Sequence, residues 1–472
     1  MTGTDKGMIF RAGRLPAVLL CLALLAGCIS RPADAPEPAE ALSPAAGTAA
    51  SAPEPTSAST PEPTPTPEPT PEPTAEPVSR TVREPSVMGG REVCPYLLPG
   101  ESESEMLVQW TGPVTDRTPC VVFGPDDGSG TLPSGAARAE VTRRTTSSAR
   151  SYHRFFYQAR LEVEPGKRYL YGIAEDDGEP AVLYPFVAPR DDGAFHAVFC
   201  SDTHIENRTH GSLLDVPLET ALRMAIDDGH GLDGIFLLGD MVNRPDESLD
   251  SITSSVTLMH SVPSTAVVGN HDNLGSVAAF FPAPNKDPVT WDYWFVRGRI
   301  LFIGMNIRCK SYPKHAEFLR SAAAQAQDHD WTVVMLHYSL RTNGSHGIDR
   351  DVYNLWYFIG PVLEEIDADL VISGHDHEYD RAPLMTSAGP VPDGDGDRLV
   401  KNRGEMLFVC VPTITGIKYY NRNIKTDYTM AAEGAEKNRG FVLADFSPEE
   451  IRFRCVNIDT GETVDEFVLS RG

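Results

Sequence analysis

Apolar runs of strand length alternate with amphipathic stretches of helical period throughout the chain after residue 191. Six of these runs predict strands, at 196–200, 234–239, 265–269, 300–305, 332–336 and 369–373. Helical stretches lie between them, at 218–226, 316–326 and 355–366. Because strands that are apolar at every position are buried on both faces, helices must cover the sheets. The pattern predicts an α/β domain over 191–472, closed by antiparallel strands at 440–446, 451–458 and 465–470.

The preceding region, 86–190, consists of short strand-like pieces separated by turns rich in glycine, proline and aspartate. This pattern is typical of a small all-β sandwich. The turn 164-EPG-166 resembles one that is common in fibronectin type III-like domains. The region contains no histidine cluster, so we interpret it as a packing or spacer domain.

Basic residues precede the apolar run 15-LPAVLLCLALLAG-27, which predicts a secretory signal peptide over 1–27. The run is too short to span a bilayer. Its end, 25-LAG-27 followed by Cys28, resembles the lipobox of bacterial lipoproteins, whose cysteine is lipidated after cleavage. The alternative is an ordinary signal peptide. The sequence therefore predicts an exported bacterial lipoprotein on the extracytoplasmic face of the cell membrane, which meets the membrane only through its lipid anchor.

Residues 28–85 are dominated by proline, glutamate and threonine, a composition that cannot form a core and that predicts a disordered stalk. The formal net charge of the whole chain is -25. Since an acidic surface repels phosphates, we expect no binding to nucleic acid. Any site that handles phosphate in this chain needs bound cations.

Cysteine usage excludes one class of metal site. No two cysteines form a CxxC pair, so a thiolate zinc site is not expected. Export permits disulfides, and Cys94 with Cys120 is the pairing that we favour. Cys200 and Cys410 lie in strand-like apolar runs and are expected to be buried thiols.

Polar side chains follow five of the predicted strands, at the point where each strand ends. They are Asp202, His204, Asp240, Asn270, His271, Asp272, His337, His375 and His377. The carboxyl ends of strands form the ligand crevice of open α/β sheets, so we expect these side chains to converge. Residues at i and i+2 of an extended segment point the same way, so Asp202 with His204 and His375 with His377 can each reach one site.

Carboxylate, amide and imidazole ligands suit divalent Zn, Fe or Mn, and one aspartate, for which we choose Asp240, can bridge two ions. Two metals about 3.5–4 Å apart clamp the attacking and leaving oxygens of a phosphoryl transfer. Such cations would also supply the positive charge that the acidic chain lacks.

The motifs DTH, GDMVN, GNHD, a lone His337 and GHDH, spread over 196–381, resemble those of the calcineurin-like metallophosphoesterases. The resemblance implies a four-layer αββα sandwich with two metal ions. It assigns the first metal to Asp202, His204, Asp240 and His377, and the second to Asp240, Asn270, His337 and His375. It also implies that a metal-bound hydroxide attacks the phosphorus, that His271 protonates the leaving oxygen and that Asp272 steadies the His271 ring.

The fibronectin-like region, the extended GHDHEYDR ending and the C-terminal strand near 458–467 resemble the purple acid phosphatase branch. That branch usually has a tyrosine where Asn243 stands and lacks the histidine that is His204 here. The resemblance therefore does not imply a coloured ferric centre, and His204 can take the coordination place of the tyrosine. His346, in the Gly-rich loop 343–349, and Arg381 are candidate substrate-binding residues, with a structural role as the alternative for both.

These observations predict a metallophosphoesterase that hydrolyses small extracellular phosphomonoesters, as acid phosphatases do. One alternative is a phosphodiesterase acting on nucleotides or glycerophosphodiesters. Another is a non-catalytic surface binding protein on the same scaffold. The sequence fixes neither the metals nor the oligomeric state.

Overall fold

A computed structural model describes Val78 and residues 81–144, 154–190, 192–207, 209–243, 245–326, 328–422, 426, 428–435 and 437–472, with 245–248 described by their backbone alone. The predicted signal peptide, Cys28 and nearly all of the predicted stalk lie outside these residues. Among the described residues, no helix is long and apolar enough to cross a membrane. Residues Pro71–Gly472 form one compact unit.

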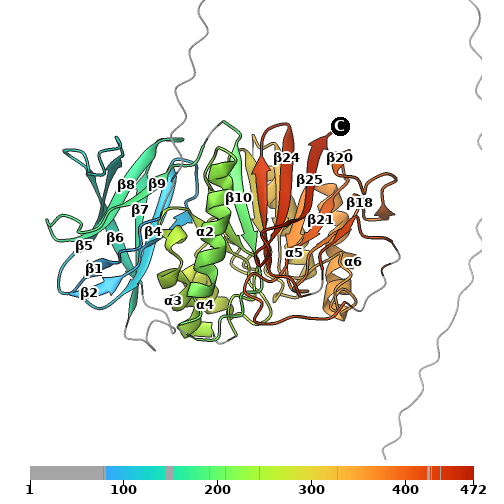
Figure 1. Cartoon of the computed structure of the whole chain (residues 1–472), viewed down its shortest axis with the longest axis horizontal. Helices are drawn as coiled ribbons and strands as arrows, with labels where there is room; N and C mark the ends of the chain where they lie inside the picture. The colour runs from blue at the N-terminus through green and yellow to red at the C-terminus, as the bar shows by residue number, and fades with distance from the viewer. Residues whose placement is uncertain are drawn as a thin grey trace, which may run out of the picture. The chain divides into compact units, whose positions relative to one another are not determined.

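Two seven-stranded sheets form the centre of the α/β part (Figure 1). The first has the order β12 (Ser264–Ala266), β11 (Gly234–Leu237), β10 (Phe195–Cys200), β23 (Gly440–Phe446), β24 (Glu450–Asn457), β25 (Thr463–Arg471) and β20 (Arg398–Lys401). The second has the order β13 (Tyr293–Arg297), β14 (Ile300–Gly304), β15 (Trp331–Met335), β16 (Leu370–Ser373), β21 (Leu407–Cys410), β17 (Asp380–Arg381) and β22 (Ala432–Glu433). The neighbours β10, β11 and β12 are parallel, as are β14, β15, β16 and β21, so their carboxyl ends lie at one edge of each sheet.

Helices cover the outer faces of both sheets (Figure 1). The helical segments beside the first sheet are α2 (Ser212–Asp227), α3 (Pro245–Ser255), the 3-10 turn η1 (Thr257–His260) and α4 (Leu274–Phe280), and those beside the second are α5 (Tyr312–Gln325) and α6 (Arg350–Glu365). Strand β10 shows the layering, because Val198 packs towards α2 whereas its neighbour Phe199 packs between the sheets. The predicted four-layer α/β fold is confirmed.

The N-terminal part is all-β, as predicted. A small pair, β1 (Ser86–Met88) and β2 (Arg91–Val93), precedes a seven-stranded sheet with the order β3 (Tyr96–Pro99), β4 (Glu105–Gly112), β7 (Phe155–Glu162), β6 (Ala137–Arg144), β5 (Pro119–Pro125), β8 (Arg168–Glu175) and β9 (Tyr184–Val187). Its core includes Trp110 stacked on Tyr157, with ring centroids 5.5 Å apart. It also packs on α4, where the Tyr96 hydroxyl donates to the Phe280 carbonyl at 2.9 Å. Sequence reasoning missed β6, whose side chains are mostly polar and largely exposed.

The expected Cys94–Cys120 disulfide is wrong, because both thiols are free. Cys94 lies between β2 and β3, whereas Cys120 lies in β5, whose partners are β6 and β8. Cys200 and Cys410 are buried, as predicted. Burial raises the pKa of Cys200 to about 12, so this thiol stays protonated and inert.

Candidate metal centre

All seven predicted metal ligands lie in loops that follow the carboxyl ends of strands, but the strands belong to two sheets. From the first sheet, the loops after β10, β11 and β12 supply Asp202, His204, Asp240 and Asn270. From the second sheet, the loops after β15 and β16 supply His337, His375 and His377. The centre therefore lies where the edges of two facing sheets meet, rather than in the crevice of one sheet.

The backbone at this centre adopts a conformation that non-glycine residues rarely take. Five of the ligands have φ values between 45° and 78°, namely Asp202, His204, Asp240, His375 and His377. Each such residue costs on the order of 1–3 kcal/mol and persists only where its surroundings impose it. The paired ligands at i and i+2 thus converge through left-handed residues, and not through the extended segment that we expected.

Glycines let these loops approach one another closely. A Cβ on Gly269 of GNHD would lie 2.1 Å from Asp240 Oδ1, and one on Gly374 of GHDH would lie 1.8 Å from Ser201 Oγ. Both separations are far below van der Waals contact. Gly374 follows a strand of the second sheet and Ser201 a strand of the first, so this glycine joins the two halves of the centre.

Asp202, His204 and His377 form the first group of ligand atoms. Asp202 Oδ1 lies 3.2 Å from His377 Nε2 and 3.8 Å from His204 Nε2. The two imidazole Nε2 atoms are 3.0 Å apart. Asp202 Oδ2 accepts the backbone N–H of His375 at 2.8 Å, whereas the buried Oδ1 has no hydrogen-bond partner among the described residues. Asp202 Oδ1 therefore faces the two imidazoles and has no hydrogen-bond donor among the described residues, so it can serve as a metal ligand.

Asp240, His337 and His375 form the second group. Asp240 Oδ2 lies 3.2 Å from His337 Nε2 and 3.8 Å from His204 Nε2 of the first group. Asn270 Oδ1 lies 3.2 Å from His337 Nε2. A single carboxylate oxygen thus faces both groups, which is the position that a bridging ligand requires.

The imidazoles are oriented as metal ligands. The Nδ1–H of His337 donates to the Leu238 carbonyl at 2.8 Å, and that of His377 donates to the Lys418 carbonyl at 2.7 Å. Because a neutral imidazole carries one N–H, the Nε2 atom of each ring presents a lone pair to the centre. The Nε2 atoms of His377 and His204 are 3.0 Å apart, and two lone pairs at this distance repel unless a cation lies between them. The residues present therefore fit divalent cations with oxygen and nitrogen ligands.

The electrostatics of the centre also call for cations. Burial by itself would raise the pKa of Asp202 and Asp240. The nearby imidazoles of His377 and His337 lower these pKa values by more, so the pKa of Asp240 falls to about 2 and that of Asp202 lies well below its usual range. Burial lowers the pKa of His337, and the charges of Asp240 and Asp202 then raise it to about 10. Positive charge is therefore favoured beside these two carboxylates, and bound cations would supply it.

His271 lies at the rim of the centre. Its side chain is 36% exposed, and its Nε2 is 3.9 Å from Asp240 Oδ2. Its backbone N–H donates to Asp240 Oδ1 at 2.8 Å. This position can reach the leaving group of a substrate, but His271 also forms a candidate ligand group with His204 and Asp240. A role as proton donor and a role as ligand are thus both geometrically open to it.

Asp272 does not hold the His271 ring as the resemblance implied. Its Oδ1 accepts the backbone N–H groups of Met241 and Val242 at 2.9 and 3.2 Å, and its Oδ2 accepts that of Gly269 at 2.9 Å. This buried carboxylate therefore ties together the loops after β11 and β12. It positions Asp240 and Asn270 through their backbones rather than steadying an imidazole.

Asn243, which stands where a tyrosine was expected, supports a ligand. Its Oδ1 accepts the Nδ1–H of His204 at 2.8 Å, and its Nδ2 donates to Glu206 at 3.2 Å, which fixes the orientation of the amide. Asn243 thus directs the His204 Nε2 into the centre.

We expect Asn243→Ala to lower metal affinity by about 10- to 100-fold, the usual cost of losing the partner of a ligating histidine. Asn243→Asp keeps the acceptor and should lose less. Competition against a chelator of known affinity measures both. Equal affinities for the alanine variant and the wild type would remove Asn243 from the support of the centre.

His346, one of the candidate substrate-binding residues, lies beside the second group. Its ring centroid is 4.5 Å from that of His375, and its backbone N–H donates to Asp376 at 2.8 Å. Its Nε2 is buried and has no hydrogen-bond partner in the described part of the chain. The Nδ1 of His346 lies 2.9 Å from Asp349 Oδ2 and carries the N–H, so Nε2 can donate to a bound phosphate when the ring takes up a second proton.

Sequence reasoning missed the segment 418–420, which contacts His346 through Tyr420. The Tyr420 ring lies 4.5 Å from both His346 and His377, and Lys418 Nζ lies 4.6 Å from the Tyr420 ring centroid. This segment follows β21, the parallel neighbour of β16. The apolar run 407–411 was the signal for it, since it is a further buried strand whose end reaches the same edge.

Arg381 has a structural role, which was the alternative to substrate binding. Its side chain is only 1% exposed, and its guanidinium donates to Asp465 at 2.7 and 3.2 Å and to the Gly396 carbonyl at 2.9 Å. It also lies over the Phe467 ring, 4.4 Å from the centroid. The buried guanidinium is thus paired with the protein, and Arg381 joins β17 to β25.

Replacing Arg381 with glutamine should leave the carboxylate of Asp465 buried without its cation and cost about 3–5 kcal/mol of unfolding free energy. The Michaelis constant of the folded enzyme should not change. Urea denaturation measures the first and steady-state kinetics the second. Arg452→Gln, which removes an exposed pair with Glu450, is the matched control. A raised Michaelis constant at unchanged stability would restore the anion-binding role.

Comparison with known proteins agrees with this geometry. Residues 195–379 match the family model described as calcineurin-like phosphoesterase. Two uncharacterized proteins of Mycobacterium tuberculosis, from strains CDC 1551 / Oshkosh and ATCC 25618 / H37Rv, are each 22% identical over 363 residues. The match covers 65% of this chain and 66% of each relative, so the chain spans just under two thirds of the length of these relatives.

Solved structures share the fold. The purple acid phosphatase PPD1 from yellow lupin (Lupinus luteus) seeds has a TM-score of 0.65 at 16% identity, over 80% of this chain and 74% of that one. PhoD has a TM-score of 0.50 at 11% identity, over 80% of this chain and 89% of that one. Residues 191–472 make up less than 80% of the chain, so the likeness in fold extends into the N-terminal all-β part. The resemblance to the calcineurin-like phosphoesterases is confirmed for residues 195–379, the part of the chain that matches that family model.

Proposed function

We propose that this protein is a binuclear metal-dependent phosphoesterase that hydrolyses small phosphomonoesters. The observation that carries the proposal is the position of Asp240 Oδ2, which faces His337 Nε2 at 3.2 Å and His204 Nε2 at 3.8 Å. One oxygen that serves two ligand groups is the arrangement that holds two cations close together. The calcineurin-like phosphoesterase match over the same loops supports the same chemistry.

Asp202, His204, Asp240 and His377 would hold one cation, and Asp240, Asn270, His337 and His375 the other. Two such cations polarise a phosphoryl oxygen and stabilise the charge that develops on the attacking and leaving oxygens. His271 donates its proton to the departing oxygen from the rim. Protonated His346, whose Nδ1–H donates to Asp349, donates from Nε2 to a non-bridging phosphate oxygen, and the ammonium of Lys418 adds positive charge on the same side. The two bound cations, His346 and Lys418 would thus place positive charge around the substrate phosphate in an otherwise acidic protein.

We further propose that the enzyme works outside the cytoplasm, as a lipoprotein held through Cys28 at the extracytoplasmic face of the cell membrane. The support is the apolar run 15–27 and the lipobox-like 25-LAG-27 before Cys28. The substrates would then be phosphomonoesters that reach the cell surface from outside.

The test is metal analysis of tag-free protein, with hydrolysis rates for one monoester and one diester. We expect two divalent ions per chain at the catalytic centre, faster hydrolysis of the monoester, and loss of both activities with a chelator. A faster diester rate would make the enzyme a phosphodiesterase. Two bound ions without hydrolysis of either substrate would make it a binding protein on this scaffold.

A further inference from the structure

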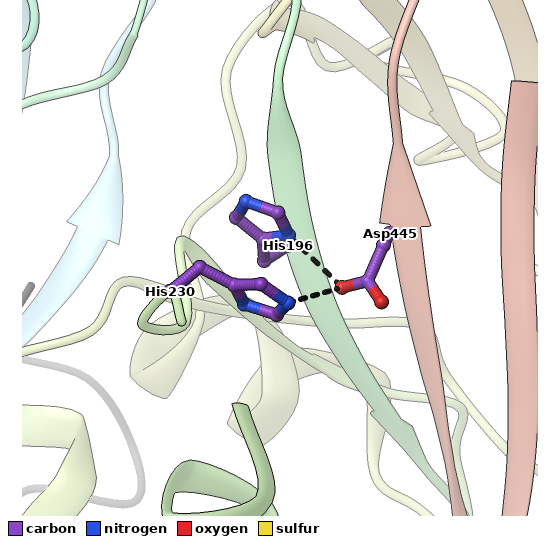
Figure 2. A group of neighbouring side chains, drawn as sticks. All are labelled: His196, His230 and Asp445. Carbon is purple, nitrogen blue, oxygen red and sulfur yellow. Dashed lines mark hydrogen bonds and ion pairs between the residues drawn. The ribbon is translucent and has the colours of Figure 1, made fainter. Parts of the chain in front are cut away.

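Figure 2 shows a second cluster of metal-ligating side chains, made by His196, His230 and Asp445. His196 comes from β10 and Asp445 from β23, and the two residues are direct partners in the antiparallel register. His230 comes from the connection between α2 and β11. The ligand atoms of all three lie within 4.8 Å of one another. Two strands and one loop therefore meet at one potential cation site.

Both histidines present a nitrogen to the same carboxylate oxygen. His196 Nδ1 lies 2.9 Å and His230 Nε2 lies 3.4 Å from Asp445 Oδ1. Zinc ligands at about 2.0–2.1 Å in a tetrahedron are about 3.3 Å apart, so these separations are close to those of a bound site. The side chains of His196, His230 and Asp445 are 13%, 18% and 28% exposed, which leaves room for water as a fourth ligand.

Hydrogen bonding leaves a place for a cation. The Nδ1 of His230 lies 3.1 Å from the Gly231 carbonyl, which can only accept, so this nitrogen carries the N–H. The Nε2 of neutral His230 then turns a lone pair towards an oxygen of Asp445 that also carries lone pairs. A shared cation removes this repulsion. Arg452, the cross-strand partner of Asp445, is paired with Glu450. The nearby Arg454 is paired with Asp228.

The two imidazole rings stack in parallel, with centroids 3.6 Å apart and planes 7° from each other. One ion cannot lie in both ring planes in this arrangement, so one ring must turn to bind it. His230 is the ring that can turn, because it is carried by a loop. His196 is held by β10, where its backbone N–H donates to Asp233 at 2.9 Å.

We propose that His196, His230 and Asp445 bind one Zn²⁺ ion that fastens the α2–β11 connection to β10 and β23. Two imidazoles and one carboxylate favour zinc over magnesium or calcium, which prefer oxygen ligands alone. The site is independent of the catalytic centre, because His196 lies near the start of β10 and Asp202 lies beyond its end. Six residues of near-extended chain separate them by on the order of 20 Å.

The experiment counts zinc in tag-free full-length protein that has been stripped with a chelator and dialysed against Zn²⁺. The wild type should bind one zinc ion per chain more than the His230→Gln and Asp445→Asn variants. In these near-isosteric variants, zinc affinity at this site should fall by more than about 100-fold. Losing the hydrogen-bond partner of a ligand already costs about 10- to 100-fold in metal affinity, and losing the ligand itself should cost more. Their hydrolytic rates should match the wild type. His329→Gln, whose ring nitrogen contacts Thr332, is the control and should leave the count unchanged.

Equal zinc counts in the wild type and the two variants would overturn the proposal. The cluster would then be two stacked imidazole rings that pair with the Asp445 carboxylate. If the variants do not fold, the wild type still decides, because no zinc beyond the catalytic pair would overturn the proposal. Asp240→Asn separates the two centres, since it should lose the catalytic ions and keep the zinc that His196 binds. Failure of the proposed phosphoesterase function would leave this count unaffected.

Discussion

Asp240→Asn is expected to remove both catalytic cations and to lower phosphoester hydrolysis by far more than about 100-fold. One oxygen of Asp240 faces both ligand groups, so replacing it with an uncharged amide weakens two ions at once. Changing an outer partner of a ligand already costs about 10- to 100-fold in affinity or activity, and a shared ligand must cost more. Each single histidine variant in the centre should therefore retain more metal than Asp240→Asn.

Elemental analysis and hydrolysis rates measured on the same samples provide the test. Asp292→Asn is the matched control, because Asp292 is also a fully buried carboxylate paired with a histidine, His315, but lies outside the centre. It should retain two cations if it folds. An Asp240→Asn protein that keeps two cations would show that the bridging ligand is another group, for which Asp202 Oδ1 is the nearest candidate.

His271→Gln is expected to keep both cations and to lose about 10²- to 10⁴-fold in rate on an alkyl phosphate, with a far smaller loss on a nitrophenyl phosphate. Positioned proton transfer contributes gains of this size, and it matters in proportion to how poorly the leaving oxygen departs unaided. A nitrophenolate leaves without a proton. The exposed position of His271 at the rim of the centre suits this task.

The measurement combines metal content with the rates on the two substrates. His346→Gln is the comparison, since a residue that binds phosphate should affect both substrates equally. Equal losses for His271→Gln on both substrates, with two cations bound, would leave His271 as a positioning group. Loss of a cation would instead make it a ligand, which its grouping with His204 and Asp240 permits.

Strands with strong apolar runs could be predicted closely. Predicted strands at 196–200, 300–305 and 332–336 appear as Phe195–Cys200, Ile300–Gly304 and Trp331–Met335. The missed strand Ala137–Arg144 lies in the N-terminal seven-stranded sheet with its side chains largely exposed, so the hydrophobic pattern could not reveal it. Helix α4, at Leu274–Phe280, is only two turns long and was likewise beyond the pattern.

The sequence by itself determined which residues could hold metal, because a ligand's chemistry is a property of its side chain and strand ends are visible as the points where apolar runs stop. Asp202, Asp240 and His337 were found in this way. Tertiary structure decided their arrangement, since pairing of strands far apart in the chain places β10 and β16 in different sheets. It also decided what the remaining polar groups do. Arg381 is paired with Asp465, and Asp272 accepts hydrogen bonds from backbone N–H groups. These partners come from distant segments that pack together, and no local sequence pattern shows such packing.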